Sequence, residues 1–357
     1  MRCFNHLLSN RNYAMKNILK KTPAPSFFLG IDVGKVDLYC HIISASELTS
    51  SRFDNTASGI KKLLTWIKTN SNTDSLSACL EQTGHYGKAV ATALHQLNIL
   101  SLHLVNPRRV KAYGNQKLRR NKSDTADAKL IAQFLKSEQS NLINWEPQPL
   151  DNEKITELSR YAESMTRDNA RLKTKCEATT KPLILRSLKR RIKAQEKEIE
   201  AIRKQINKII QGNETLKFIY QLLKSIPGIG EVCCHIVIAE LPDISLFSNA
   251  RQLAAWAGLT PQHHQSGTSG RTTTPITKIG SAHLRSGLFM PAMNARVFNP
   301  LLKTFADRLK ENGKKPKQII IAVMRKLLHQ IYGILKSGEP YNPEKRGFQN
   351  NSKPLTT

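Results

Sequence analysis

The sequence predicts a chain in three parts: an α/β domain, a central pair of long helices and a mainly α-helical C-terminal domain. Over residues 27–140, short apolar runs alternate with amphipathic stretches, as in an α/β layer with a partly parallel sheet. Over residues 151–211, apolar residues recur at spacings of three and four, which is the pattern of long helices. Beyond residue 212 the pattern stays mostly helical, and a stretch rich in Gly, Ser and Thr at residues 265–274 interrupts it.

The elements of the first part follow from local patterns. Residues 27–33 and 38–43 are strand-like runs on either side of the turn residues Gly34 and Lys35, so we expect a β-hairpin there. A helix should begin near Ser123, because serine is a good N-cap. Further strands are expected at residues 75–80 and 100–105, and further helices at 60–67 and 86–97.

The central helices are separated by a break at Lys181 and Pro182. The second arm keeps apolar residues at heptad positions for more than three heptads, which favours a coiled coil over residues 150–211. The two arms could fold back as an antiparallel hairpin or pair between subunits, and the sequence does not choose between these arrangements.

The charge of the chain predicts a polyanionic partner. Its 357 residues include 55 Lys and Arg against 27 Asp and Glu, a formal net charge of +28. Nucleic acid is the commonest polyanion, although acidic substrates and anionic membranes would also attract such a chain. No apolar run approaches the roughly 20 residues of a spanning helix. The six cysteines are scattered without a CxxC pair, which is typical of reduced thiols in a cytosolic protein.

Four carboxylates could form a metal site. Asp32 lies on the first predicted strand and Glu81 follows a later one, while Asp124 and Asp127 share one face of a predicted helix. Carboxylates from strand ends and a helix commonly hold one or two Mg²⁺ ions, which serve phosphodiester chemistry. The alternative is that the two helical aspartates only favour the helix N-terminus and that Glu81 is a surface residue.

A basic tract precedes the two helical aspartates. Residues 106–122 contain seven basic side chains and no acid, and such a tract can deliver a polyanion to a carboxylate cluster. The candidate nucleic-acid-binding residues in it are Arg108, Arg109, Lys111, Lys117, Arg119, Arg120 and Lys122.

Two motifs of the C-terminal part could also contact nucleic acid. Gly228 and Gly230 form a tight turn before an apolar helical run, so backbone N–H groups there could approach a phosphate. The alternative is an ordinary turn between packed helices. Further on, Ser266 lies among small residues in a loop where Arg271 adds positive charge, and such an open hydroxyl can be a nucleophile. A loop of this composition is more often only a loop.

Together these residues resemble the DEDD-type transposases of the insertion sequence one-ten family, relatives of the Piv DNA invertase. The resemblance spans roughly residues 27–335 and depends on the order and spacing of short segments. They are GIDVGK at 30–35, LEQTG at 80–84, KSDTADA at 122–128, IPGIG at 226–230, AGLTP at 257–261 leading to Ser266-Gly267, and KIG at 278–280 followed by Leu284-Arg285.

The resemblance implies a fold and a domain layout. Residues 27–145 would form a RuvC-like domain of the ribonuclease H fold, residues 150–211 a coiled coil and residues 215–337 a transposase domain with a catalytic serine. Residues 1–26 would be a basic, disordered arm and residues 338–357 a disordered tail.

The resemblance also implies a mechanism. Asp32, Glu81, Asp124 and Asp127 would form an acidic tetrad that binds Mg²⁺. Ser266 would attack a DNA phosphate and form a covalent protein–DNA link. Ser269 repeats the Ser-Gly pair, but the distance of Ser266 from the Ala-Gly-Leu segment suits the family pattern better.

The implied partners are the DNA of the element ends and target, a structured RNA encoded by the element, and further copies of the chain in a dimer or tetramer. The implied location is the cytoplasm of a prokaryote, at the nucleoid, without a membrane partner.

Two other functions fit the residues: a RuvC-like nuclease that resolves junctions with metal-activated water, and a non-catalytic, dimeric nucleic-acid-binding protein. A covalent protein–DNA adduct excludes the first of these, and strand cleavage excludes the second.

Overall fold

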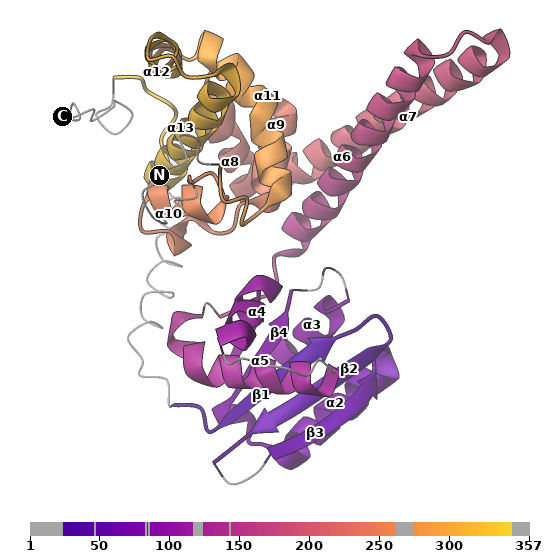
Figure 1. Ribbon diagram of the computed structural model, residues 1–357, viewed down its shortest axis with the longest axis vertical. Helices are drawn as coiled ribbons and strands as arrows, with labels where there is room; N and C mark the ends of the chain where they lie inside the picture. The colour runs from indigo at the N-terminus through magenta and orange to yellow at the C-terminus, as the bar shows by residue number, and fades with distance from the viewer. Residues whose placement is uncertain are drawn as a thin grey trace. The chain divides into compact units, whose positions relative to one another are not determined.

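The structure is a computed structural model that describes residues 24–45, 48–82, 84, 86–116, 124–142, 144–261 and 275–344. The chain divides into two compact units, Met1–Gln148 and Pro149–Thr357. Figure 1 shows both units.

The N-terminal unit contains a mixed five-stranded sheet with the order β3-β2-β1-β4-β5. The first three strands are antiparallel neighbours, whereas β4 and β5 run parallel to β1, which confirms the predicted partly parallel sheet. The strands are β1 (Phe27–Val33), β2 (Asp37–Ile43), β3 (Leu48–Asp54), β4 (Leu76–Glu81) and β5 (Ser101–Val105).

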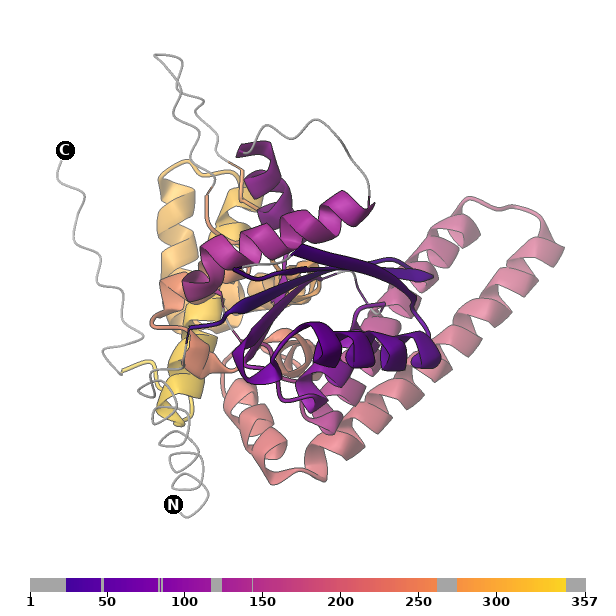
Figure 2. The same ribbon diagram turned by 90° about the horizontal axis from the view of Figure 1, so that it is seen from below.

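Helices cover both faces of this sheet (Figure 2). One face packs against α2 (Ala57–Asn70) and α3 (Lys88–Gln96), and the other packs against α4 (Pro107–Gln116) and α5 (Asp124–Glu138). Because β1 lies between two helical layers, nearly all of its side chains are buried. Its apolar run is therefore continuous, as expected for a central strand.

Two of the longer elements of this unit were not predicted. β3 alternates between exposed and half-buried positions and has no apolar run, because it forms the edge of the sheet. α4 begins at Pro107, which is favourable at the first position of a helix although the same residue ends the preceding strand.

The C-terminal unit begins with α6 (Leu150–Glu177) and α7 (Pro182–Gln211), which pack along one another as a helical hairpin (Figure 1). Their facing sides bury Ile155 and Met165 from α6 and Ile199 and Ile206 from α7. The two predicted arms therefore fold back within one chain. The coiled-coil geometry and any pairing between copies remain predictions.

The rest of this unit is a helical bundle with one large apolar core. Its longest helix ends at Gly338, which has the left-handed conformation (φ 69°) favoured by glycine after a helix. The helices are α8 (Glu214–Lys224), α9 (Glu231–Glu240), α10 (Ala250–Trp256), α11 (Ala282–Phe298), α12 (Pro300–Glu311) and α13 (Pro316–Ser337). Among the described helices, none has the length and apolar character needed to cross a bilayer.

The C-terminal tail is predicted to be disordered from residue 338, and residues 338–344 of it belong to the described part of the chain. Tyr341 packs against the core of the bundle, and its hydroxyl donates a hydrogen bond to Asn299 Oδ1 at 3.0 Å. Its backbone amide donates to the hydroxyl of Ser225 at 2.8 Å. The tail is mostly polar, so its sequence pattern does not predict this contact of Tyr341. Residues 1–23 and 345–357 lie outside the described residues.

Candidate active site

Two of the four predicted carboxylates lie at the same end of neighbouring parallel strands. Asp32 is the sixth residue of β1, and Glu81 is the last residue of β4. Ile31 pairs with Leu80, so Asp32 and Glu81, the residues that follow them, lie side by side where the strands end. We call this end of the strands the edge of the sheet. This edge is the carboxyl end of the parallel pair, where open α/β sheets commonly bind ligands.

The other two carboxylates are brought to this edge by a close approach between α5 and β1. A Cβ atom at Gly30 would lie 2.3 Å from both the carbonyl oxygen of Ala128 and the amide nitrogen of Ala132. Only glycine leaves room for the helix backbone at this distance. The first turn of α5, with Asp124 and Asp127, thereby lies beside the end of β1.

The result is a compact group of three carboxylates. One carboxylate oxygen from each of Asp32, Asp124 and Asp127 lies within 4.8 Å of the other two. Asp124 is exposed, whereas Asp32 and Asp127 are half-buried. Oxygen ligands at this spacing fit a hard divalent cation, which takes carboxylates from several elements.

Glu81 belongs to the same electrostatic cluster, although it is not one of the three mutually close ligands. Burial raises the pKa of its carboxyl above the ordinary value, and the negative charges of Asp32 and Asp127 raise it further. Four acids gathered in this way repel one another, and a bound divalent cation would relieve that repulsion. We call Asp32, Glu81, Asp124 and Asp127 the carboxylate cluster.

The described part of the basic tract lies on α4. Arg108, Arg109 and Lys111 are exposed, while Val110 between them is buried against the rest of the unit. Arg109 lies over the ring of Phe134 at 5.6 Å and faces Glu138 at 3.9 Å. Its guanidinium therefore also contacts α5. The other predicted cations of the tract, Lys117, Arg119, Arg120 and Lys122, lie outside the described residues.

In the Gly-rich turn before α9, packing explains why one of the two positions is a glycine. Gly228 has a φ of 98°, and a Cβ atom there would lie 2.6 Å from the Cα of Ala295 on α11. Gly230 is exposed, and nothing lies within 4 Å of a Cβ added to it. The backbone at Gly230 is therefore open, while Gly228 serves the contact with α11. Binding of nucleic acid by either residue remains a prediction.

Ser266, Ser269 and Arg271 lie outside the described residues, but the residues that flank this segment, 257–261 and 275–281, are described; we call them the base of the loop. Pro261 and Ile276 form an antiparallel bridge, so the two ends of the loop are close together. Arg285 holds this base by donating from Nη1 to the carbonyl oxygens of Ala257 (3.0 Å) and Gly280 (3.1 Å).

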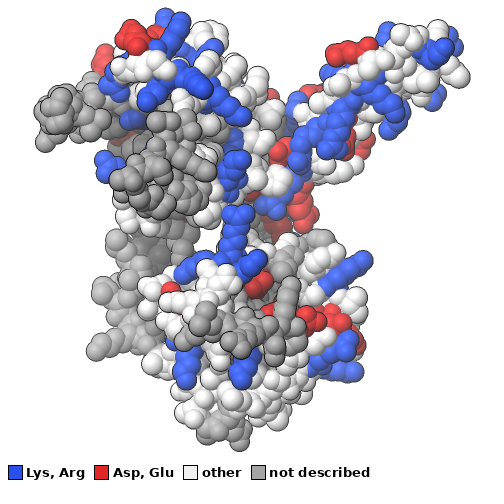
Figure 3. Space-filling model, viewed as in Figure 1, with Lys and Arg blue, Asp and Glu red and all other residues white. Residues whose placement is uncertain are grey.

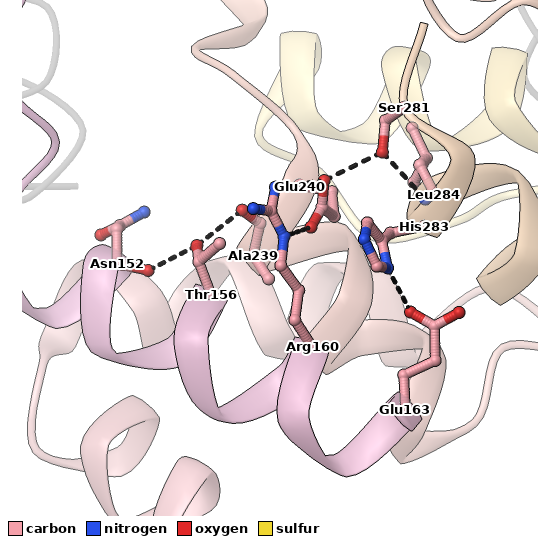
Figure 4. Close-up of polar contacts among 9 residues, drawn as sticks. All are labelled: Asn152, Thr156, Arg160, Glu163, Ala239, Glu240, Ser281, His283 and Leu284. Atoms are coloured by element: carbon pink, nitrogen blue, oxygen red, sulfur yellow. Dashed lines mark hydrogen bonds and ion pairs between the residues drawn. The ribbon is translucent and has the colours of Figure 1, made fainter. Parts of the chain in front are cut away.

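Sequence reasoning missed a polar network that ties the base of the loop to the helical hairpin (Figure 4). Arg160 of α6 donates to both carboxylate oxygens of Glu240 at the end of α9, at 2.7 and 3.2 Å. Ser281, the N-cap of α11, donates to Glu240 Oε2 at 2.9 Å and accepts from the amide of Leu284 at 3.1 Å. No pattern in the sequence connects these positions, because Arg160 and Glu240 are 80 residues apart.

Two further contacts extend the same junction. The hydroxyl of Thr156 donates to the carbonyl oxygens of Asn152 and Ala239 at 2.8 and 2.9 Å, and His283 of α11 pairs with Glu163 of α6 (Figure 4). The hairpin, α9 and α11 are thereby joined by side chains at one place.

Glu240→Gln is expected to lower the free energy of unfolding by about 1–3 kcal/mol at neutral pH, because the carboxylate side chain is only 4% exposed and has a charged partner. Burial alone raises the pKa of Glu240, but the hydrogen bond and charge of Arg160 outweigh it, so the pKa lies below the ordinary value. Ionised Glu240 therefore stabilises the fold above its ordinary pKa, and this contribution is lost as the pH falls through the lowered value.

Urea denaturation of wild type and Glu240→Gln at several pH values measures this difference. The difference in the free energy of unfolding between the two proteins should become smaller in acid, below the ordinary pKa of about 4.3 for glutamate. Arg171→Gln is the matched control, because it breaks an exposed pair with Asp168 on the same helix α6 and should change stability little. Equal stability of wild type and Glu240→Gln at neutral pH would show that the network contributes nothing.

Comparison with known proteins places both units in one family. A model described as "Transposase", for the DEDD proteins of IS110 elements, matches residues 29–185, and a model described as "Transposase IS116/IS110/IS902 family" matches residues 220–307. The pilin gene-inverting proteins of Moraxella lacunata and Moraxella bovis are each 32% identical over 319 residues, which cover 88% of this chain and 97% of theirs.

More distant relatives match part of the chain. The insertion element IS110 43.6 kDa protein of Streptomyces coelicolor is 25% identical over 162 residues, which cover 45% of this chain and 39% of that protein. Among solved structures, Thermus thermophilus RuvC in complex with a Holliday junction substrate matches 33% of this chain and 99% of its own, with 13% identity and a TM-score of 0.27.

Proposed function

This chain belongs to the IS116/IS110/IS902 family of transposases, and we propose that its carboxylate cluster is the metal-dependent centre at which DNA strands are cut and exchanged. The observation that carries the proposal is the convergence of Asp32, Asp124 and Asp127 within 4.8 Å, with Glu81 in their field. The order and direction of the five strands, with helices on both faces, support a RuvC-like, ribonuclease H fold for this unit.

The four acids fit Mg²⁺, which prefers carboxylate oxygens and phosphates as ligands. Asp32 and Asp127 would hold it from the half-buried side and Asp124 from the exposed side, with Glu81 at the end of the neighbouring strand. When bound, such an ion supplies charge that stabilises the leaving oxygen of a phosphodiester and activates the attacking group.

The cations of α4 would bring the substrate to these acids. Arg108, Arg109 and Lys111 are exposed on the helix that directly precedes the loop leading to Asp124. They would bind phosphates of the DNA backbone without reading its sequence. Without such cations, the negative cluster would repel a polyanion.

The nucleophile of our proposal is the hydroxyl of Ser266. Its oxygen would form a bond to the phosphorus of the scissile phosphate as the bond from phosphorus to the leaving strand oxygen breaks, and the proton lost by the serine hydroxyl would end on that leaving oxygen. The bridge between Pro261 and Ile276, the described residues that flank this segment, is compatible with this role because it fixes the two points from which the segment starts and ends.

We further propose that a structured RNA encoded by the element selects the DNA, and that the chain acts as a dimer or tetramer in the cytoplasm, at the nucleoid. A net charge of +28 supports a nucleic-acid partner in addition to the DNA at the active site. If base pairing with the RNA selects the DNA sequence, the protein itself needs mainly contacts with the phosphate backbone of the nucleic acid.

The experiment uses cells that carry the gene with its native flanking DNA, and amplifies across the junction of an excised circle. We expect a junction with wild type and with Ser269→Ala, and none with Ser266→Ala. A junction that survives Ser266→Ala would exclude this nucleophile. A junction that survives both substitutions, singly and together, would favour hydrolytic cleavage, as in a junction-resolving nuclease.

A further inference from the structure

The outward face of α7 carries a row of positive charge, with one wider interval between Lys197 and Lys204. Six Lys and Arg residues are spaced so that, at about 100° per residue, they fall within about 60° of one another around the helix. All six are exposed, and among the described residues no acid forms an ion pair with any of them. We call them the cationic stripe: Arg186, Arg190, Lys193, Lys197, Lys204 and Lys208.

The stripe lies opposite the buried side of the same helix. Leu188, Ile199, Ile206 and Ile210 are the buried residues of α7, and they pack against α6 and the helical bundle. The stripe therefore faces solvent along the length of the hairpin, where Figure 3 shows Lys and Arg side chains following both helices. Glu200 is the acid at the edge of the stripe.

This arrangement is unfavourable for the helix alone. Arg186 and Arg190, Lys193 and Lys197, and Lys204 and Lys208 are like-charge pairs at i and i+4, which destabilise a helix. A helix that only needed a solvated face would alternate the two signs. On α6, by contrast, the exposed Arg171 has an acidic partner, since it pairs with Asp168 at 2.9 Å.

The dimensions of the stripe match those of a nucleic-acid duplex. From Arg186 to Lys208 the helix rises about 33 Å, and most neighbouring cations are about 4.5–6 Å apart along the axis. A duplex presents one phosphate for about every 3.4 Å of each strand, so the stripe spans about one turn. Several of these long, flexible side chains can therefore reach phosphates where the two strands pass the helix.

We propose that the cationic stripe of α7 is a second nucleic-acid interface, which binds the phosphate backbone of a duplex without reading its sequence. It is separate from the cations of α4 and does not depend on the carboxylate cluster being catalytic. A second copy of this face would be repelled by the same charges. An anionic membrane is a poor fit, because the apolar side that would enter it is already buried against α6 and the bundle.

The test measures binding of the full-length protein to a fluorescent DNA duplex of about 20 base pairs and to an RNA duplex of the same sequence, by anisotropy in EDTA at several salt concentrations. The stripe variant carries Arg190→Gln, Lys193→Gln and Lys197→Gln. The control variant carries Arg167→Gln, Arg171→Gln and Lys175→Gln, which remove the same charge from exposed positions of α6. Thermal unfolding checks that both variants are folded.

Loss of three phosphate contacts should reduce the slope of log affinity against log salt by about 2.7 for DNA, and should weaken binding roughly 100-fold or more at about 0.1 M salt. The control variant should keep the wild-type slope. If the stripe variant binds only the DNA duplex or only the RNA duplex more weakly than wild type does, that polymer is the ligand of the stripe. An unchanged slope in the stripe variant, an equal loss in the control variant, or no binding by wild type would each overturn the proposal. Because EDTA prevents metal-dependent chemistry, these results are independent of whether the carboxylate cluster cuts DNA.

Discussion

Asp124→Asn is expected to reduce strand cleavage and exchange at least about 1,000-fold, equivalent to about 4 kcal/mol in the barrier, while thermal stability stays equal to that of wild type or rises. Asparagine keeps the shape of aspartate, so the helix should be preserved, although it loses the favourable interaction of a carboxylate with the first turn of α5, about 0.3–1 kcal/mol. It lacks the negative charge by which Asp124 would join Asp32 and Asp127 in holding a cation. Removing that charge also relieves repulsion within the carboxylate cluster.

Junction formation in cells and melting of the purified protein together test this expectation. Asp74→Asn is the matched control, because Asp74 is an exposed acid of the same unit on the short helix Thr73–Ser75. It should retain both activity and stability. If Asp124→Asn instead lowers the melting temperature strongly, or keeps full activity, Asp124 is a structural residue at the start of α5.

Gly30→Ala is expected to cost about 3 kcal/mol or more of stability in the N-terminal unit, which is a large part of the stability of a typical domain. The added methyl group would lie 2.3 Å from two backbone atoms of α5, and a helix backbone cannot turn aside as a flexible side chain can. Either α5 moves away from β1 or the unit unfolds. In both cases Asp124 and Asp127 leave Asp32, so activity should be lost as well.

Tryptophan fluorescence, to which Trp66 and Trp145 at the core of this unit contribute, together with circular dichroism can follow its unfolding in urea. Gly230→Ala is the control, because an added Cβ there meets nothing within 4 Å and its φ is −94°. It should change stability much less. A stable, active Gly30→Ala protein would contradict the close approach of α5 and β1 on which the geometry of the site depends.

Much of the architecture could be predicted because burial leaves a local pattern. The strands β1, β2, β4 and β5 are apolar runs, and all were predicted to within a residue or so of their bounds. β3 was missed because an edge strand needs no apolar run. The convergence of Asp32 with Asp124 and Asp127 was also predicted, since strand ends and a helix start commonly meet.

The remaining features depend on contacts between distant residues, which leave no periodic signal. Gly30 and Ala132 touch across about a hundred residues, and so do Gly228 and Ala295 across about seventy. The pairing of Arg160 with Glu240 is of the same kind. The sequence pattern shows which residues are apolar or charged. Only the packing of the folded chain shows which glycine cannot be replaced by a larger residue and which buried charge has a partner.

The most direct test of the central claim is a calorimetric titration of the full-length protein with Mg²⁺ and with Mn²⁺, repeated on Asp124→Asn. The carboxylate cluster predicts saturable binding by the wild type, and an affinity that falls by at least about tenfold in the variant. Asp74→Asn should bind as the wild type does. If the wild type shows no saturable binding, or if Asp124→Asn binds equally well, the cluster of Asp32, Glu81, Asp124 and Asp127 is not a metal centre.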